Sequence, residues 1–231
     1  MPGTATAPPR RLGRPNGRRP ADPDGVSTED RILAVAERVF AGHGYVAASL
    51  REIAAGADVT QALIIYYFGS KQGLFETLFK RRGLEISRQR QEALDALLAR
   101  SEAPTVRELV AAYLLPQFAL RGAGAGGMAF VRMQARLHHE PDELALRLRR
   151  EVYDSATRNY ITAIGRAVPG LNAADAYWRM MFAVGTYLYM LSGYDRLSDI
   201  SDGRFTTDDT EEVLRRLTDF LVAGITAPGS K

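Results

Sequence analysis

The 231-residue sequence contains no cysteine, and only three of its residues are histidine. The first absence excludes disulfides, thiolate metal sites and cysteine nucleophiles, and it suits a reducing cytosol. Two of the histidines, His138 and His139, are adjacent at an expected helix end, where a cationic turn explains them better than a metal site does. No spacing indicates a nucleophile triad. We therefore expect no catalytic residue, no metal, no cofactor and no enzyme.

Long hydrophobic runs are also missing. The longest apolar segment, residues 180–191, is shorter than the ~20 residues that a membrane-spanning helix needs. The N-terminus has no apolar stretch typical of a secretion signal. These features predict a cytoplasmic protein that does not contact a membrane.

A strand pattern is absent as well, because apolar residues recur at helical spacing and seldom alternate. The predicted fold is all-α with about nine helices, separated by glycine, proline and polar stretches. The first helix begins after Ser27 and stops at residues 42–44. The others are expected at 49–56, 60–68, 70–100, 105–121, 127–139, 141–167, 172–193 and 208–226, with a polar loop at 194–207 and a kink at Pro116.

Positive charge is concentrated in the first third of the chain. Residues 1–82 carry 12 Lys and Arg against 8 Asp and Glu, whereas residues 83–231 carry 18 against 19. This asymmetry favours a polyanion as the partner of the first third. We predict a disordered basic arm at 1–26, a first helical domain at 27–82 and a second helical domain at 83–231.

Residues 60–71, TQALIIYYFGSK, look like a strand by propensity but follow a short capped helix and a three-residue turn. That arrangement has the spacing of a helix–turn–helix motif. A helix of two turns that is apolar nearly all round must bury one side and offer the other to a partner.

The block from Ser49 to Phe75 resembles the TetR family of bacterial transcriptional regulators. The matching features are the Phe-x-x-x-Gly-Tyr end of the first helix, the Arg-Glu-Ile-Ala step and Tyr-Tyr-Phe-Gly-Ser-Lys. The resemblance covers about residues 27–82 and implies a three-helix DNA-binding head followed by a helical ligand-binding and dimerisation domain. The sequence departs from the family at Asp58, where glycine is usual, and at Ile65 and Tyr67, where Tyr or His is common.

The resemblance also implies which residues reach DNA. Arg51 is suited to guanine and Gln61 to adenine, and Ala62 and Ile65 can meet a thymine methyl group. Hydroxyl and ammonium groups at helix N-termini suit phosphates. The full predicted DNA-binding set is Ser49, Arg51, Thr60, Gln61, Ala62, Ile65, Tyr66, Tyr67 and Lys71. The Gly-Arg-Pro sequence in the arm resembles a minor-groove hook, although a merely solubilising tail is the alternative.

Aromatic and methionine side chains in the second domain indicate either core or an apolar ligand pocket. Arg132 and Arg136 could hold an acidic head group, or face solvent. The predicted ligand set is Tyr113, Phe118, Arg132, Met133, Arg136, Tyr153 and Trp178, and the predicted effector is an amphipathic acid. The apolar segment 178–191 and the last helix suggest a homodimer interface formed by Val184, Leu188, Leu214, Leu217 and Leu221, with burial inside the monomer as the alternative.

These patterns favour a homodimeric, sequence-specific regulator that binds a palindromic operator in double-stranded DNA and acts as a repressor released by a small molecule. Two other classes stay open. One is a helical small-molecule-binding protein or enzyme with a vestigial DNA-binding region. The other is an architectural DNA binder driven by its arm.

Overall fold

The computed structural model describes residues 25–101, 103–139, 143–191 and 195–228. Within these ranges the chain forms ten α-helices and no strand, which confirms the all-α prediction. Apart from residues 25 and 26, the predicted basic arm lies outside the described residues.

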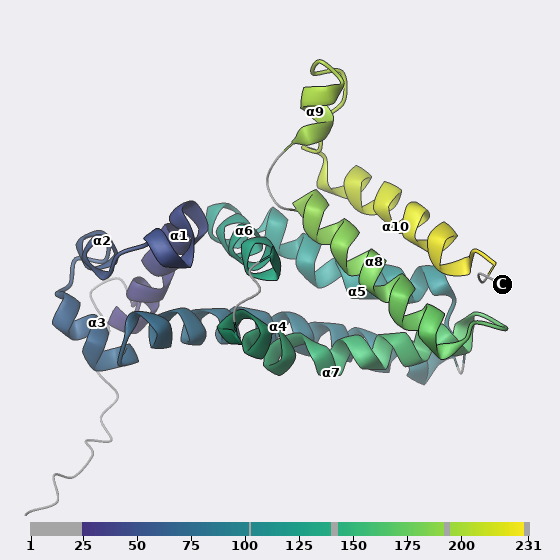
Figure 1. Cartoon of the computed structure of the whole chain (residues 1–231), viewed down its shortest axis with the longest axis horizontal. Helices are drawn as coiled ribbons and strands as arrows, with labels where there is room; N and C mark the ends of the chain where they lie inside the picture. Colours follow the sequence, from purple (N-terminus) through teal and green to yellow (C-terminus); the bar gives the residue numbers. More distant parts are fainter. Residues whose placement is uncertain (1–24, 102, 140–142, 192–194, 229–231) are drawn as a thin grey trace, which may run out of the picture.

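Three helices form a head at one end of an elongated molecule (Figure 1). They are α1 (Thr28–Ala47), α2 (Leu50–Gly56) and α3 (Gln61–Phe68). Gly44 has a positive φ of 78°, so the regular part of α1 breaks there, as the glycines at 42–44 predict. A further turn of helix then follows the break.

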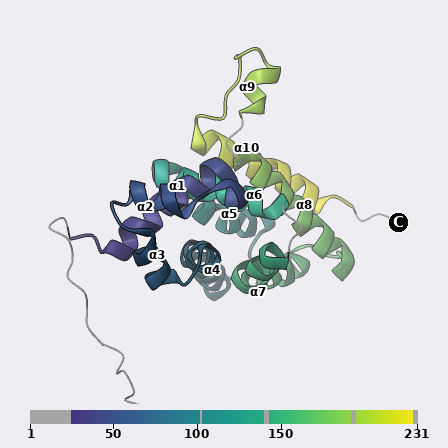
Figure 2. The same cartoon turned by 60° about the vertical axis from the view of Figure 1, so that its left-hand side comes forward.

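Helix α4 (Lys71–Arg100) leads from the head along the whole body and crosses the expected domain boundary at residue 82 without a break. Its 30 residues span about 45 Å. Against it pack α5 (Val106–Gly122), α6 (Ala125–His139) and α7 (Glu143–Ala167). Helix α8 (Ala173–Leu191) packs on α6 and α7, and α10 (Thr210–Thr226) packs on α5 and α8. Figure 2 shows the same layers turned by 60°.

Two hydrophobic cores hold these helices together. The first joins the head to α6 and α7, because Ile32, Phe40 and Ile64 share it with Phe130 and Val152. The second lies between the later half of α4 and helices α5, α7, α8 and α10. The head is therefore packed on the body through apolar contacts and does not hang from a linker.

The polar stretch expected to be a loop at 194–207 contains a short helix, α9 (Arg196–Ile200). Asp195 caps it by accepting a hydrogen bond from the Ser198 backbone N–H at 3.0 Å. Five residues are too few to show a periodic pattern, so this helix could not be predicted from the sequence. The segment 195–209, called the α9 segment below, projects away from the body above α8 and α10 (Figures 1 and 2).

Helix α6 begins at Ala125, two residues before the predicted start. Gly127 lies in its first turn against the end of α5, where a Cβ atom would come within 1.9 Å of the Leu120 carbonyl oxygen. The glycines at 122–127 therefore permit a tight helix junction.

Candidate nucleic-acid interface

The turn between α2 and α3 is fixed by local backbone geometry and by one long side chain. Asp58 has a φ of 51°, the left-handed conformation that Asp tolerates where glycine is usual. Arg31 on α1 donates from Nε to the Ala57 carbonyl at 2.9 Å. Gly56 lets α2 approach α1, because a Cβ atom there would meet Val35 Cγ1 at 2.8 Å. The two helices of the motif thus hold a defined angle.

Hydroxyl residues cap the N-termini of α2, α3 and α4. Ser49, Thr60 and Ser70 accept hydrogen bonds from the backbone N–H groups of Glu52, Leu63 and Gly73 at 3.1, 3.2 and 2.9 Å. Each capping hydroxyl keeps its own proton, which a phosphate oxygen can accept. Glu52, which the sequence suggests as the reciprocal half of a capping box, has its carboxylate 3.1 Å from His43 Nε2.

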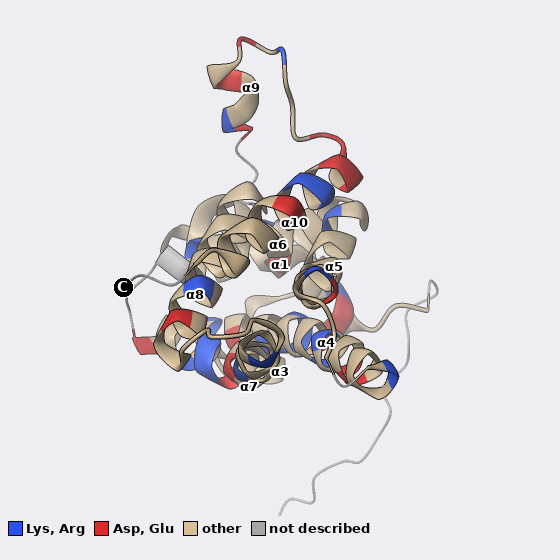
Figure 3. Ribbon diagram, turned by 90° about the vertical axis from the view of Figure 1, so that its right-hand side faces the viewer, with Lys and Arg blue, Asp and Glu red and all other residues tan. Residues whose placement is uncertain are grey.

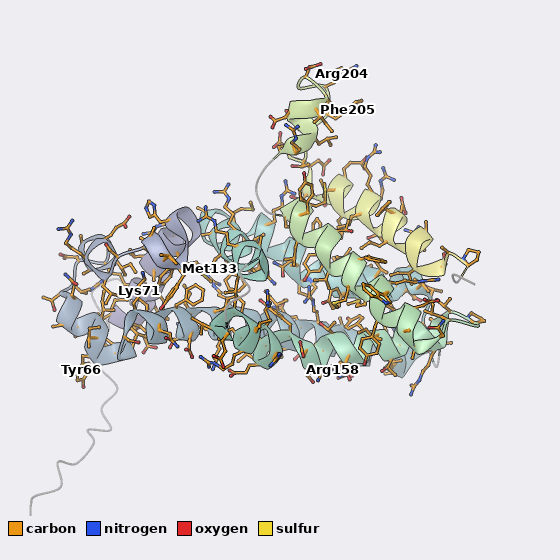
Figure 4. All side chains as sticks on the ribbon, in the orientation of Figure 1. Tyr66, Lys71, Met133, Arg158, Arg204 and Phe205 are labelled. Carbon is orange, nitrogen blue, oxygen red and sulfur yellow. The ribbon has the colours of Figure 1, made fainter. Side chains whose placement is uncertain are left out.

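Helix α3 divides its apolar residues between two faces. Ile64 is fully buried in the first core, and Phe68 packs against that core. Ile65 and Tyr66 are 42% and 63% exposed, and Gln61 and Ala62 are exposed beside them. Tyr66 points outward at the extreme end of the molecule (Figure 4). This second face is available to a groove of DNA.

The other residues predicted to contact DNA differ in their exposure and in their contacts within the protein. Arg51 is exposed on α2, whereas Tyr67 is partly buried and packs edge-on against Tyr66 with ring centroids 5.8 Å apart. Lys71, in the first turn of α4, donates from Nζ to the Val46 carbonyl at 3.0 Å and lies 4.9 Å from the centre of the Tyr45 ring. Lys71 therefore ties α4 to the end of α1 in this structure.

An ion pair between buried Glu37 and partly exposed Arg82 joins the head to α4. The Glu37 carboxylate on α1 accepts hydrogen bonds from Arg82 Nε and Nη2 at 3.2 and 3.1 Å. Burial raises the pKa of Glu37 above its ordinary value, although the hydrogen bonds from Arg82 oppose this. A second pair, Glu76 with Arg147, links α4 to α7 at 2.6 Å.

The structure divides the predicted ligand residues between the two cores and the surface, although Tyr113 and Tyr153 both lie near Arg90. Met133 and Tyr153 lie in the first core, and Tyr113 and Phe118 lie in the second. Arg132 and Arg136 are exposed, and Trp178 is 63% exposed on α8. The ligand site stays a prediction, because helical spacing gives the faces of each helix but does not say which faces meet.

Sequence reasoning missed Arg90, which is the most deeply buried arginine among the described residues at 1% exposure. Its guanidinium carbon lies 3.7 Å from the centre of the Tyr113 ring, and its Nε donates to the Tyr113 carbonyl at 2.9 Å. No sequence signal distinguishes Arg90 from the exposed arginine Arg88, because both lie in the same polar stretch of α4.

The predicted dimer residues lie in the second core or against it. Leu188, Leu217 and Leu221 are buried in the second core, and Val184 and Leu214 pack against it. The first three face the interior of the subunit, whereas Val184 and Leu214 stay partly exposed, so the interface remains a prediction. The exposed apolar residues of the same two helices are instead Tyr177, Trp178, Met181, Phe182, Tyr189 and Phe220.

In the part of the chain that the structure describes, no helix is long and apolar enough to cross a membrane. Among the same residues, no group of three or more His, Cys, Asp or Glu side chains could hold a metal ion.

Comparisons with known proteins match both parts of the chain. Residues 32–78 fit the model described as bacterial regulatory proteins, tetR family, and residues 111–224 fit that of the tetracyclin repressor-like C-terminal domain. A probable HTH-type transcriptional regulator, YttP of Bacillus subtilis, is 49% identical over 53 residues, which are 23% of this chain and 26% of YttP. The HTH-type transcriptional regulator EthR of Mycobacterium tuberculosis is 35% identical over 94 residues, 41% of each chain. The chain thus aligns with less than half the length of these relatives.

Among solved structures, the transcriptional regulator FadR of Bacillus subtilis in complex with stearoyl-CoA has a similar fold. Its TM-score is 0.58 at 19% sequence identity, and the match covers 84% of this chain and 97% of that one. The similarity extends over head and body together.

Proposed function

Because the chain belongs to the TetR family of bacterial regulatory proteins, we propose that it is a sequence-specific DNA-binding transcriptional regulator. The observation that carries the proposal is the exposed face of α3, held by three helix caps and presented at the end of the molecule. In this arrangement α3 enters the major groove, where Gln61, Ala62, Ile65 and Tyr66 meet base edges. Arg51 reaches a guanine, and the capping hydroxyls, Tyr67 and Lys71 contact phosphates.

The regulator acts as a homodimer that binds a palindrome. Helices α8 and α10 expose an apolar face, with the Trp178 and Phe182 rings 5.8 Å apart, and monomers seldom leave so large a patch in water. Beside this face, the α9 segment, α8 and α10 line a groove of about 650 Å³. Figure 4 shows Arg204 and Phe205 at the end of the α9 segment, far from the head. Pairing of these faces around a two-fold axis forms a four-helix bundle with the two heads pointing the same way.

In the proposed mechanism the protein is a repressor. A small molecule that binds the body releases the protein from its operator. Shared apolar core and the Glu37–Arg82 pair connect α4 and α6 to the head, so a ligand that moves these helices also moves the heads. The ligand shifts the equilibrium only by its difference in affinity for the two arrangements. Stearoyl-CoA in the neighbouring FadR structure is an amphipathic compound held by the same fold, and it supports the search for an amphipathic acid.

The decisive experiment is selection of bound sequences from random duplex DNA with the full chain. The proposal predicts a palindrome whose half-site centres are about 34 Å apart, one turn of DNA, or a multiple of that distance. Enrichment without any sequence preference, together with a steep loss of affinity in salt, would indicate an architectural binder instead. Absence of DNA binding by the folded protein would contradict the proposal outright.

A further inference from the structure

The interior of the body holds a positive charge that no acidic side chain among the described residues balances. Arg90 lies in the second half of α4, and its neighbours Tyr113, Tyr160 and Tyr187 come from α5, α7 and α8. Its guanidinium stacks on Tyr113 and lies 5.5 Å from the centre of the Tyr187 ring. Tyr160 donates from its hydroxyl to the Arg90 carbonyl at 2.8 Å. The side chain is thus fixed in place by aromatic and backbone groups.

Among the described residues, no carboxylate forms an ion pair with Arg90; the groups that act on its charge are the hydroxyls of Tyr113, Tyr187 and Tyr153. Burial raises the pKa of Tyr153 and of Tyr187, so these hydroxyls stay neutral and cannot balance the charge. An arginine keeps its proton at any physiological pH. A buried charge without a counter-ion is unfavourable, which makes this position attractive to an anion.

Several buried polar atoms of the described side chains also lack hydrogen-bond partners. Arg90 Nη2 is buried and has no hydrogen-bond partner among the described residues. The buried amides of Gln117 on α5 and Gln134 on α6 bond to each other at 2.5 Å, which leaves Gln117 Oε1 and Gln134 Nε2 without partners. Natural interiors satisfy nearly all such groups, and exceptions commonly mark a binding site.

A small apolar cavity adjoins Tyr113. It measures about 10 Å³ and lies between α5, α7, α8 and α10, with Leu109, Ile164, Met180 and Ala183 among its lining residues. A cavity of this size holds no organic molecule, so a ligand must separate these helices to enter. Because α8 and α10 carry the proposed dimer face, such a separation reaches the interface directly.

We propose that Arg90 is the anchor of an anion-binding site whose ligand is an organic carboxylate with an apolar body. The carboxylate accepts hydrogen bonds from the Arg90 guanidinium, including the unpartnered Nη2, and the body extends along Tyr113 into the widened apolar cavity. As the site of the effector, this inference rests on the proposed function. As a binding site, it stands on the charge and geometry of Arg90 alone.

The position of Arg90 gives the ligand a direct route to the head. Arg90 and Lys71 belong to one uninterrupted helix and are separated by about 28 Å along its axis. Any displacement of α4 at Arg90 therefore changes the end of α4 that holds α3. The exposed residues Arg132 and Arg136 offer no such buried, unbalanced charge.

The test uses the full chain and two matched series of compounds. One series is 4-phenylbutanoate, 4-phenylbutanol and 4-phenylbutylamine; the other is dodecanoate, dodecanol and dodecylamine. Titration calorimetry and thermal unfolding should show binding and stabilisation by a carboxylate in at least one series, with its alcohol and amine at least tenfold weaker. Equal binding of the alcohol, or no binding of either carboxylate up to its solubility limit, overturns the proposal without any substitution.

Variants then assign the site. Arg90→Gln and Arg90→Met should each weaken carboxylate binding at least tenfold, whereas Arg158→Gln should leave it unchanged. Arg158 is an exposed arginine on α7 that pairs with Asp154 at 2.7 Å (Figure 4). Arg90→Met should stay folded, because it removes an unbalanced buried charge and keeps an apolar side chain of similar length. If the folded Arg90 variants bind the carboxylate as the unchanged protein does, Arg90 is not the anchor.

Operator binding, measured separately, distinguishes this inference from the proposed function. A carboxylate that binds through Arg90 without releasing DNA leaves the site intact but ends its role as an effector site. Release of DNA by a compound whose binding ignores Arg90 keeps the regulator and refutes the anchor.

Discussion

Ser49, Thr60 and Ser70 serve the fold and the proposed interface with the same hydroxyl group. Each oxygen caps a helix, while each proton remains for a phosphate. Substituting them would remove about 0.5–2 kcal/mol of helix stabilisation along with any DNA contact. Arg51 is a cleaner probe of recognition, because it is exposed and caps no helix.

We expect Arg51→Ala to cost about 1–3 kcal/mol of operator binding and to relax preference at one base pair in each half-site, since a bidentate contact to guanine is lost. Binding to the selected operator and to its single-base variants measures this. Lys71→Ala is the comparison. It should lower the slope of affinity against salt and leave base preference unchanged. Uniform weakening of Arg51→Ala on every sequence would reassign Arg51 to a phosphate.

Glu37 should give the free energy of unfolding a recognisable pH dependence. Its pKa is raised in the folded protein, mainly by burial, so the folded state holds this proton more tightly than the unfolded chain does. The contribution of Glu37 to stability therefore falls as pH rises from its ordinary pKa, 4.5, through the raised value.

Denaturant unfolding of the unchanged protein and of Glu37→Gln across this pH window isolates the effect. The difference in stability, unchanged minus variant, should decrease with rising pH and then level off. A difference that increases instead would mean that Arg82 outweighs burial and that the pKa of Glu37 is lowered.

Among the helices, α4 connects the head to the proposed anion site. Its first turn holds α3, Arg82 binds α1, and Arg90 lies in the interior of the body. The junction with α3 is tight, because a Cβ atom on Gly73 would lie 2.0 Å from the Phe68 carbonyl oxygen. Gly69, with a φ of 76°, ends α3 and allows the chain to turn into α4.

Gly73→Ala should therefore displace the end of α3, lowering both the unfolding temperature and operator affinity. Gly165→Ala is a matched control within α7, where a Cβ atom would meet nothing within 4 Å. That change should stabilise the protein by up to about 1 kcal/mol and leave DNA binding unaltered. Thermal unfolding and operator titration measure both variants. Equal behaviour of the two would show that the junction tolerates a methyl group.

At the scale of the whole molecule, charge and apolar surface are distributed unequally. Viewed from the end of the body, Figure 3 shows Lys, Arg, Asp and Glu intermingled along the helices. Many of the exposed large apolar residues gather on α8, α10 and the α9 segment. Such a surface suits a second copy of the chain better than it suits water.

Phe182→Arg should convert the dimer to monomers and abolish operator binding, because it places a charge in the apolar face of α8 where Phe182 is 64% exposed. Leu84→Arg on α4 is the control, since Leu84 is also an exposed apolar residue but lies outside α8 and α10. Sedimentation of both variants decides the matter. A dimeric Phe182→Arg protein would place the interface elsewhere.

The sequence by itself determined the helices of the head and the division of α3 into two faces. Caps such as Ser49 and Thr60, the left-handed Asp58 and the 3.6-residue period act between residues close in the chain, so they can be identified without tertiary contacts. Much of the body followed from the same period and from its glycine and proline breaks. The short α9 did not, because a single turn of helix carries no period.

Only the tertiary structure decided which faces of the body helices meet. Helix α8 is apolar nearly all round, so its sequence could not tell buried Leu188 from exposed Phe182. Likewise Arg90 is buried because Tyr113, Tyr160 and Tyr187 come from three other helices to surround it. Burial depends on contacts between residues distant in the chain, and a helical period specifies a face but not its neighbour.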